Sequence, residues 1–91
     1  SVDAKLVQIK WGDTDKCFDV SGGENKDGTK IQLWSCDSDQ ANQKLKVSGD
    51  QIKWANTDKC IDVRGGENKD GTQIQLWSCD AEHVNQKFSF I

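Results

Sequence analysis

The 91-residue sequence contains no proline, methionine or tyrosine, and only 34% of its residues are hydrophobic. Leu, Ile, Val and Phe together contribute 19 residues, close to the composition below which chains do not fold. Any hydrophobic core must therefore be thin. Four Trp, four Cys and a net charge of only −3 are nevertheless untypical of a disordered chain. We expect residues 1–91 to form one small domain.

The sequence also lacks an excess of basic residues, since 12 Lys and Arg stand against 15 Asp and Glu. A protein that binds nucleic acid has to neutralise phosphates, and nothing here supplies the charge for it. No apolar run is long enough to cross a bilayer, and no charged segment followed by an apolar one begins the chain. We expect no nucleic-acid partner, no membrane insertion and no signal peptide in this chain.

An internal repeat is the strongest feature of the sequence. Residues 6–48 match residues 49–91 at 28 of 43 positions. The longest matches are GGENKDGT and IQLWSCD, and the Trp and Cys positions recur with them. A fixed period of this length predicts two copies of one structural unit that pack together. We define repeat one as residues 6–48 and repeat two as residues 49–91.

Short alternating segments separated by polar turns fill each repeat. In repeat one they are residues 8–11, 17–20, 31–34 and 44–47. Strict alternation of apolar and polar residues is typical of half-buried strands, and Gly-Gly and Asp-Gly pairs are typical of turns. No window shows an apolar stripe with helical periodicity. The fold class predicted is therefore all-β, with four strands per repeat.

The cysteines form one pair per repeat, Cys17 with Cys36 and Cys60 with Cys79, each 19 residues apart. Structural zinc sites usually show Cys-x-x-Cys pairs, which are absent, so we expect no metal. The repeat symmetry favours two identical disulfides over the other pairings. Each would close a loop of about 20 residues and contribute roughly 3 kcal/mol. Disulfides imply an oxidising compartment, so we expect a secreted or extracellular protein.

A disulfide across an antiparallel strand pair would also fix its register. If Cys17 lies directly opposite Cys36, then Asp19 lies opposite Trp34, and by the repeat Asp62 lies opposite Trp77. Cysteine, carboxylate and indole then share one face of the strand pair. The other face is the predicted core, formed by Phe18, Val20, Ile31 and Leu33.

A carboxylate beside an exposed aromatic ring is a suitable arrangement for holding a sugar. The ring packs against the C–H face of a pyranose and removes apolar surface from water. The carboxylate accepts hydrogen bonds from hydroxyl groups, and charge-assisted bonds are the stronger kind. Side-chain amides such as Asn42 and Gln43 both donate to and accept from neighbouring hydroxyls.

These residues resemble a known family. Cys-x-Asp-Val, then Gln-Leu-Trp-x-Cys, then Asn-Gln-x-hydrophobic, at a period near 40, is similar to the ricin-B-type lectin repeat over residues 6–91. Members of that family are β-trefoils that bind galactose-type sugars, or xylan in modules attached to glycoside hydrolases. The resemblance implies that the carboxylate bonds two sugar hydroxyls, the Trp stacks on the ring, and the Gln and Asn residues orient or bond the sugar. The implied sugar-binding residues are Asp19, Gln32, Trp34, Asn42 and Gln43 in repeat one, and Asp62, Gln75, Trp77, Asn85 and Gln86 in repeat two.

The sequence departs from the family pattern in two ways. The family's Gln-x-Trp reads Gln43-Lys44-Leu45 and Gln86-Lys87-Phe88 here, a change that we expect to alter packing more than binding. A trefoil also needs three repeats to close, whereas this chain supplies two. Three chains supply six repeats, enough for two complete trefoils, so we expect a homotrimer in preference to a dimer.

The remaining conspicuous residues have simpler interpretations. Trp11 and Trp54 are predicted to be packing residues, and Asp27 and Asp70 to be turn formers. Asp13, Asp15, Asp37 and Asp39 are predicted to lie on the solvated surface. Gln43 and Gln86 tie backbone groups together as readily as they contact a sugar. His83, the sole histidine, is matched by Gln40 in repeat one, so at most it tunes one site.

No catalytic set recurs in both repeats, so we expect neither an enzyme nor a cofactor. The leading hypothesis is a carbohydrate-binding lectin with two near-identical sites per chain, preferring galactose or N-acetylgalactosamine. A polysaccharide-targeting module that binds xylan is one alternative. A trefoil that does not bind sugar, such as a protease inhibitor, is another, although it leaves the recurrence of Asp, Trp and Asn unexplained.

Overall fold

We describe the protein from a computed structural model, over residues 5–91. Within that range the ordered elements are strands and single 3₁₀ turns, with no α-helix. Repeat one and the residue before it contain β1 (Lys5–Val7), β2 (Lys16–Val20), η1 (Ser21–Gly23), β3 (Ile31–Ser35), η2 (Ala41–Gln43) and β4 (Leu45–Ser48). Repeat two contains β5 (Gln51–Trp54), β6 (Lys59–Val63), η3 (Arg64–Gly66), β7 (Ile74–Ser78) and η4 (Val84–Gln86). The all-β expectation is confirmed.

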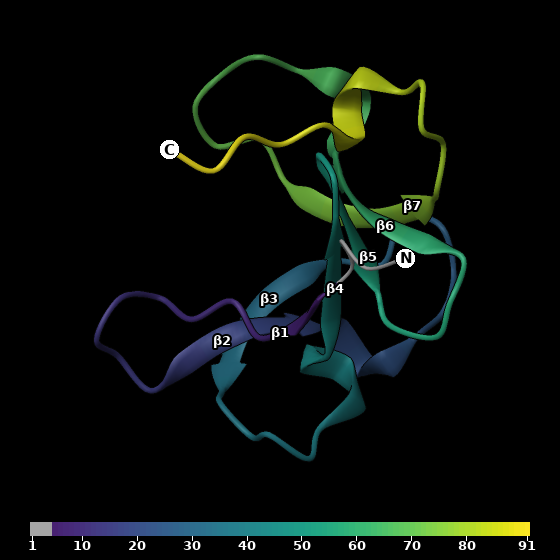
Figure 1. Cartoon of the computed structure of the whole chain (residues 1–91). Helices are drawn as coiled ribbons and strands as arrows, with labels where there is room; N and C mark the ends of the chain where they lie inside the picture. Colours follow the sequence, from purple (N-terminus) through teal and green to yellow (C-terminus); the bar gives the residue numbers. More distant parts are fainter. Residues whose placement is uncertain (1–4) are drawn as a thin grey trace.

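The two repeats form two lobes joined by the β4–β5 hairpin, with repeat one below and repeat two above in Figure 1. One five-stranded antiparallel sheet runs β1-β4-β5-β6-β7, and β2 pairs with β3 in a second sheet. Inside each lobe a strand pair carries the same register: β2 with β3 in repeat one, and β6 with β7 in repeat two. The predicted repeat is thus a structural repeat as well.

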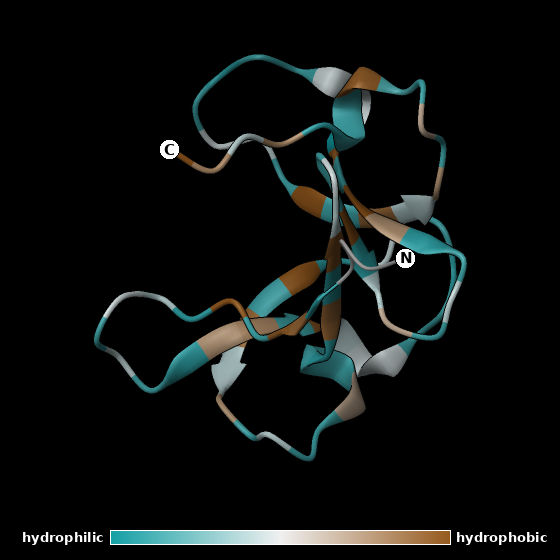
Figure 2. Ribbon diagram, viewed as in Figure 1, coloured by the Kyte–Doolittle hydropathy of each residue, from teal (hydrophilic) through white to brown (hydrophobic). Residues whose placement is uncertain are grey.

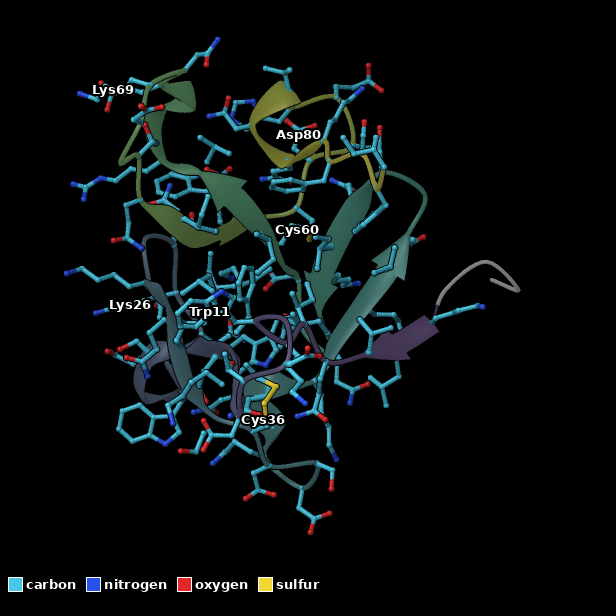
Figure 3. The ribbon with its side chains drawn as sticks, turned by 90° about the vertical axis from the view of Figure 1, so that its left-hand side faces the viewer. Trp11, Lys26, Cys36, Cys60, Lys69 and Asp80 are labelled. Atoms are coloured by element: carbon cyan, nitrogen blue, oxygen red, sulfur yellow. A yellow bond between two sulfur atoms is a disulfide. The ribbon has the colours of Figure 1, made fainter. Side chains whose placement is uncertain are left out.

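Both predicted disulfides are present, Cys17–Cys36 and Cys60–Cys79, each with a Cα–Cα distance of 5.0 Å. Figure 3 labels Cys36 in the lower lobe and Cys60 in the upper lobe. The register inferred from them is wrong by two residues, because Cys17 lies opposite Trp34 and Cys36 donates its N–H to the Asp15 carbonyl. Twist of the strand pair brings the diagonal cysteines together instead. A shift of two residues preserves the faces, so the predicted grouping of side chains still holds.

The core is small and lies between the lobes, where the strands carry their hydrophobic residues (Figure 2). Its buried members are Val20, Leu45, Ile52, Trp54, Ile61 and Leu76. Phe18 and Ile31 pack against this cluster while partly exposed. Leu33, which we expected in the core, is 43% exposed, whereas its equivalent Leu76 is 0% exposed. Repeat two has a neighbour over this position, and within residues 5–91 repeat one does not.

Contacts between the repeats account for that difference. The loop before β3 reaches repeat two, where Gly28 N–H donates to the Leu76 carbonyl and Leu76 N–H donates to the Thr29 carbonyl, both at 2.8 Å. Asp27 Oδ1 accepts from the N–H and hydroxyl of Ser78, at 2.7 and 2.9 Å. Asp27 is therefore a link between repeats, which its interpretation as a turn former had missed. The Thr29 side chain is buried beneath this contact.

Two of the predicted strands are not strands in the structure. Residues 8–11 form only an isolated bridge between Lys10 and Cys17. The C-terminal segment after η4, shown in yellow in Figure 1, has no strand assignment. These two segments are the first and the last predicted strands of the two repeats. Residues 8–11 have β2 on one side only, and neither segment has the strand partner that β4 and β5 find in each other. A strand without that partner leaves its backbone groups on that side outside a ladder.

The two tryptophans predicted to pack have different environments. Trp54 is 7% exposed, and its indole Nε1–H donates to the Ala41 carbonyl at 2.9 Å. Trp11 is 61% exposed, so its predicted packing role is wrong for a single chain. In the described residues no helix has the length and apolar character that crossing a membrane requires.

Candidate functional site

The carboxylate of Asp62 is the centre of the site in repeat two. It lies on β6, is 2% exposed, and faces Gln75 on β7. Its Oδ1 accepts from Gln75 Nε2 and its Oδ2 from Gln86 Nε2, both at 3.1 Å. Each carboxylate oxygen accepts about two hydrogen bonds, so one lone pair per oxygen remains for a ligand. The two amides fix the plane of the carboxylate in advance.

Asp19 has the same arrangement in repeat one, where it is 3% exposed. Its Oδ1 accepts from Gln32 Nε2 at 3.1 Å, and its Oδ2 accepts from Gln43 Nε2 at 3.0 Å. The direct partner of Asp19 across the strands is Gln32, and Trp34 is one step diagonal on the same face. The prediction that Asp19 faces Trp34 directly, like that for Asp62 and Trp77, is therefore corrected.

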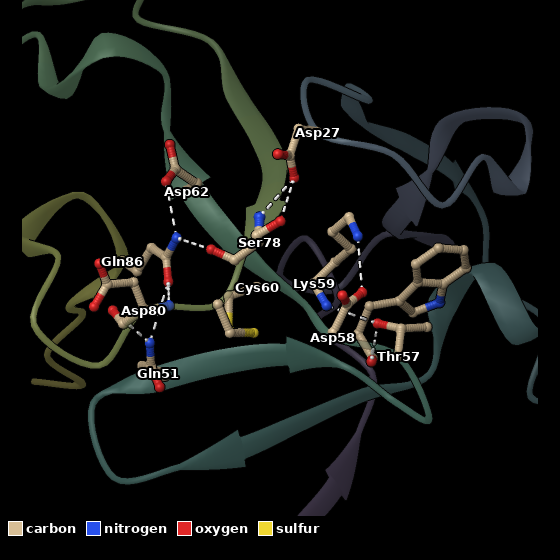
Figure 4. Close-up of a disulfide and its surroundings, with 12 residues drawn as sticks. Asp27, Gln51, Thr57, Asp58, Lys59, Cys60, Asp62, Ser78, Asp80 and Gln86 are labelled. Atoms are coloured by element: carbon tan, nitrogen blue, oxygen red, sulfur yellow. Dashed lines mark hydrogen bonds and ion pairs between the residues drawn. A yellow bond between two sulfur atoms is a disulfide. The ribbon is translucent and has the colours of Figure 1, made fainter.

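Gln86 is a structural anchor of the site. Its side chain is 0% exposed and makes four hydrogen bonds: Nε2 donates to Asp62 and to the Ser78 carbonyl, and Oε1 accepts from Asp80 N–H and from Gln51 Nε2. Figure 4 shows this network beside Cys60. Gln43 makes the corresponding four bonds in repeat one. With its hydrogen-bonding groups already used, this glutamine orients the aspartate and holds the turn.

The indole of Trp77 supplies an apolar surface next to the carboxylate. Trp77 is 42% exposed and Trp34 59% exposed, which is unusual for so large a hydrophobic residue. Both lie near the end of their strands, on the same face as the aspartate. An exposed ring beside a fixed carboxylate therefore occurs once in each repeat.

Asn85 lies against a glycine that the sequence pattern did not single out, and a larger residue there would displace it. A Cβ added to Gly66 would lie 2.5 Å from Asn85 Oδ1, and a Cβ on Gly23 would lie 2.8 Å from Asn42 Oδ1. Both glycines also have a φ near +63°, a conformation that L-residues rarely adopt. The recurring Gly-Gly pair is the sequence signal that could have identified this requirement.

These side chains surround an open cavity of about 560 Å³ in repeat two. It is lined by Gly28, Asp62, Arg64, Gly65, Gln75, Trp77, His83 and Asn85. Four predicted residues therefore come together here: Asp62, Gln75, Trp77 and Asn85. Gly28 and Arg64 were not predicted, and Gly28 belongs to repeat one. At the positions of Arg64 and His83, repeat one carries Ser21 and Gln40.

The pKa shifts in the described residues lie at the surface, away from the cavity. The Lys59 ammonium, which bonds the Asp58 carboxylate at 2.7 Å, lowers the pKa of Asp58 below its ordinary value. Lys16 lowers the pKa of Asp15 in the same way. Asp13, Asp15, Asp37 and Asp39 are exposed, as expected. Within residues 5–91 no group of three His, Cys, Asp or Glu side chains is arranged to hold a metal ion.

Comparisons with known proteins agree with this geometry. Residues 5–91 match the family model of the ricin-type β-trefoil lectin domain. Comparisons with curated proteins and with solved structures gave no significant match. The family match indicates carbohydrate binding, and with the two disulfides it is consistent with an extracellular or secreted location. The chain belongs to the ricin-type β-trefoil lectin domain family.

Proposed function

We propose that this chain is a lectin without catalytic activity that binds galactose or N-acetylgalactosamine at two sites per chain. The observation that carries the proposal is a buried carboxylate, held by two glutamine amides, beside an exposed indole. The aspartate accepts from two neighbouring sugar hydroxyls through its free lone pairs, and Trp77 packs against the apolar face of the ring. Asp19 and Trp34 do the same in repeat one.

The absence of catalysis is part of the proposal. Hydrolysis of a glycosidic bond requires two carboxyl groups about 5–9.5 Å apart that flank it. Asp62 is the one carboxylate that lines the cavity. Each of its oxygens already accepts from one amide donor, which suits a fixed acceptor better than a group that exchanges protons.

Several sites on one particle raise the avidity for cell-surface glycans. We propose that the chain assembles as a homotrimer, because six repeats complete two trefoils without a remainder. Exposed apolar residues in both repeats support association, among them Trp11, Leu33, Val84 and Phe90. Light scattering checks this: we expect a mass near three times 10.2 kDa. A 20 kDa species would favour a dimer instead.

The test of sugar binding is Asp62→Asn combined with Asp19→Asn. Asparagine loses the charge but keeps the shape and one acceptor, so one of the two glutamine amides keeps its bond, whereas alanine would remove the acceptor of both. Loss of a charge-assisted bond costs about 1.5–3 kcal/mol, or roughly 10- to 150-fold in affinity. Calorimetry with lactose measures it. Asp58→Asn, an exposed aspartate outside the cavity, is the matched control.

A glycan array separates the remaining possibilities. We expect binding to terminal galactose or N-acetylgalactosamine. Binding confined to xylan would replace the galactose specificity with that of a polysaccharide-targeting module. Full lactose binding by the double variant would remove the two aspartates from the site, and binding to no glycan at all would favour a trefoil whose function lies on its loops.

A further inference from the structure

The sugar site of repeat two includes a residue from the neighbouring repeat. Gly28 lines the cavity with Asp62 and Trp77, and it is held there by its N–H bond to the Leu76 carbonyl. The same loop is fixed by the Asp27–Ser78 bonds, drawn beside the site in Figure 4. The wall of this site is therefore supplied by the loop 26–30 of repeat one.

Repeat one lacks that wall. Its positions equivalent to Leu76 and Ser78 are Leu33 and Ser35. Within residues 5–91 no backbone bond from a neighbouring repeat reaches Leu33, which is 43% exposed. The Asp19 site is consequently open on the side where the Asp62 site is closed.

The chain also carries a second copy of the loop that would close the Asp19 site. Residues 65–72 repeat the sequence of residues 22–29, including the Asp-Gly-Thr that docks onto β7. Thr72 makes the same internal bonds as Thr29. Its hydroxyl donates to the carbonyls of Lys69 and Glu67, three and five residues earlier, as the hydroxyl of Thr29 donates to those of Lys26 and Glu24. Thr29 is buried against repeat two, whereas its equivalent Thr72 is partly exposed. The loop is formed, and within the described residues it has no strand to cover.

A second contact between the repeats also has equivalent residues that are left exposed. Trp54 donates to the Ala41 carbonyl, and β4 pairs with β5 beside it. The equivalent groups are Trp11, 61% exposed, and Val84, 74% exposed. Residues 8–11 correspond to β5 and residues 88–91 to β4, and neither segment is a strand in the structure. Each lacks the partner that the other would supply.

We propose that the sugar site of repeat one is completed by a second copy of this chain. The free edge of repeat two in one copy (Asp70–Thr72, Val84 and residues 88–91) covers the open side of repeat one in another (Trp11, Leu33 and residues 8–11). The partner is a second copy because both halves of the contact are repeat equivalents of the interface that already joins the two repeats within the chain. Gly71 of one copy then takes, beside Asp19 of the other, the place that Gly28 has beside Asp62.

The inference rests on the proposed sugar binding and makes the two sites differ. The Asp62 site is complete in one chain, whereas the Asp19 site binds sugar only after association. Lactose titration by calorimetry tests this with one site at a time. In Asp62→Asn only the repeat-one site can still bind sugar, and in Asp19→Asn only the repeat-two site can. A monovalent sugar keeps avidity out of the comparison.

Trp11→Arg separates the chains in this experiment. Trp11 lines neither site and makes no side-chain hydrogen bond in the described residues, so the lobe retains its fold. We expect the mass measured by light scattering to fall to that of one chain, 10.2 kDa. On the Asp62→Asn background we expect at least a tenfold loss of lactose affinity. On the Asp19→Asn background affinity stays unchanged, which also shows that the variant is folded.

Three outcomes overturn the inference: a wild-type chain of 10.2 kDa at micromolar concentration, a Trp11→Arg variant of undiminished mass, or equal lactose affinity with and without Trp11→Arg on the Asp62→Asn background. Failure of the proposed function looks different. In that case neither single-site variant binds lactose, while the masses of the wild type and Trp11→Arg still report whether the contact exists.

Discussion

Leu33 and Leu76 occupy the same position in two repeats that are identical at 28 of 43 positions. One is 43% exposed and the other 0% exposed. Trp11 and Trp54 differ in the same way, with exposed fractions of 61% and 7%. The local sequences do not account for this, because β3 and β7 both read Ile-Gln-Leu-Trp-Ser. What differs is the neighbour: the loop before β3 and Ala41 of repeat one cover Leu76 and Trp54, and within residues 5–91 no equivalent segment covers Leu33 and Trp11.

The largest expected effect follows from the leucine pair. Leu76→Ala should lower the free energy of unfolding by about 2–5 kcal/mol, because a fully buried side chain leaves a cavity in a thin core. Leu33→Ala at low protein concentration should cost less than about 1 kcal/mol, since much of that side chain is already in water. Urea unfolding followed by tryptophan fluorescence measures both.

Protein concentration sharpens the same comparison. If a second copy covers Leu33, the cost of Leu33→Ala rises with concentration toward that of Leu76→Ala. Equal costs at the lowest concentration would mean that the difference in exposure between the two positions has no energetic consequence, and would contradict the explanation by neighbours.

The paired residues also show how far the sequence could lead. The period of 43 residues and both disulfides follow from comparing the two repeats in sequence. The strand class and the face shared by Asp19, Gln32 and Trp34 follow from alternation within one repeat. Alternation along a strand decides which side chains share a face. A register error of two residues leaves that grouping unchanged, so the predicted faces are correct. The register itself depended on where the cysteines lie across the strands, and a diagonal disulfide is not distinguishable from a direct one by spacing.

Features that depend on contacts between the repeats could not be predicted from the sequence pattern. Within repeat one alone, Asp27 is a turn residue. Its carboxylate accepts from Ser78 only because repeat two packs beside it. Gly28 joins the Asp62 cavity for the same reason. The strands expected at 8–11 and 87–90 fit the pattern, but neither has the strand partner that β4 and β5 find in each other. Local signals identify a strand, whereas its pairing is a property of the assembled repeats.

The disulfides provide a test in which the two repeats should behave alike. Each bond joins cysteines 19 residues apart, so each restricts the unfolded chain equally and contributes about 3 kcal/mol. We expect Cys17→Ala with Cys36→Ala to cost as much as Cys60→Ala with Cys79→Ala, within about 1 kcal/mol. Urea unfolding of the two double variants measures it. A markedly greater cost in repeat two would show that native packing, and not the unfolded chain, dominates the stabilisation.

The smallest expected difference concerns the ion pairs that precede β2 and β6. Lys59 and Asp58 are 2.7 Å apart and Lys16 and Asp15 3.0 Å apart, but the Lys59 side chain is 11% exposed and that of Lys16 40%. Removal of Asp58 leaves a more buried ammonium without its partner, so Asp58→Asn should destabilise the fold more than Asp15→Asn, although both effects stay small because the carboxylates are exposed.

Acid titration distinguishes this electrostatic effect from a packing change. The lysine lowers the pKa of each aspartate from its ordinary value of 3.8. A folded pKa below the unfolded one gives stabilisation that is present above about pH 4 and is lost as the pH falls through the folded pKa. The urea midpoints of wild type and Asp58→Asn should therefore differ at pH 6 and converge toward about pH 2. A difference that persists at the lowest pH would assign the effect to packing around Lys59, and an equal shift for Asp15→Asn would erase this last distinction between the repeats.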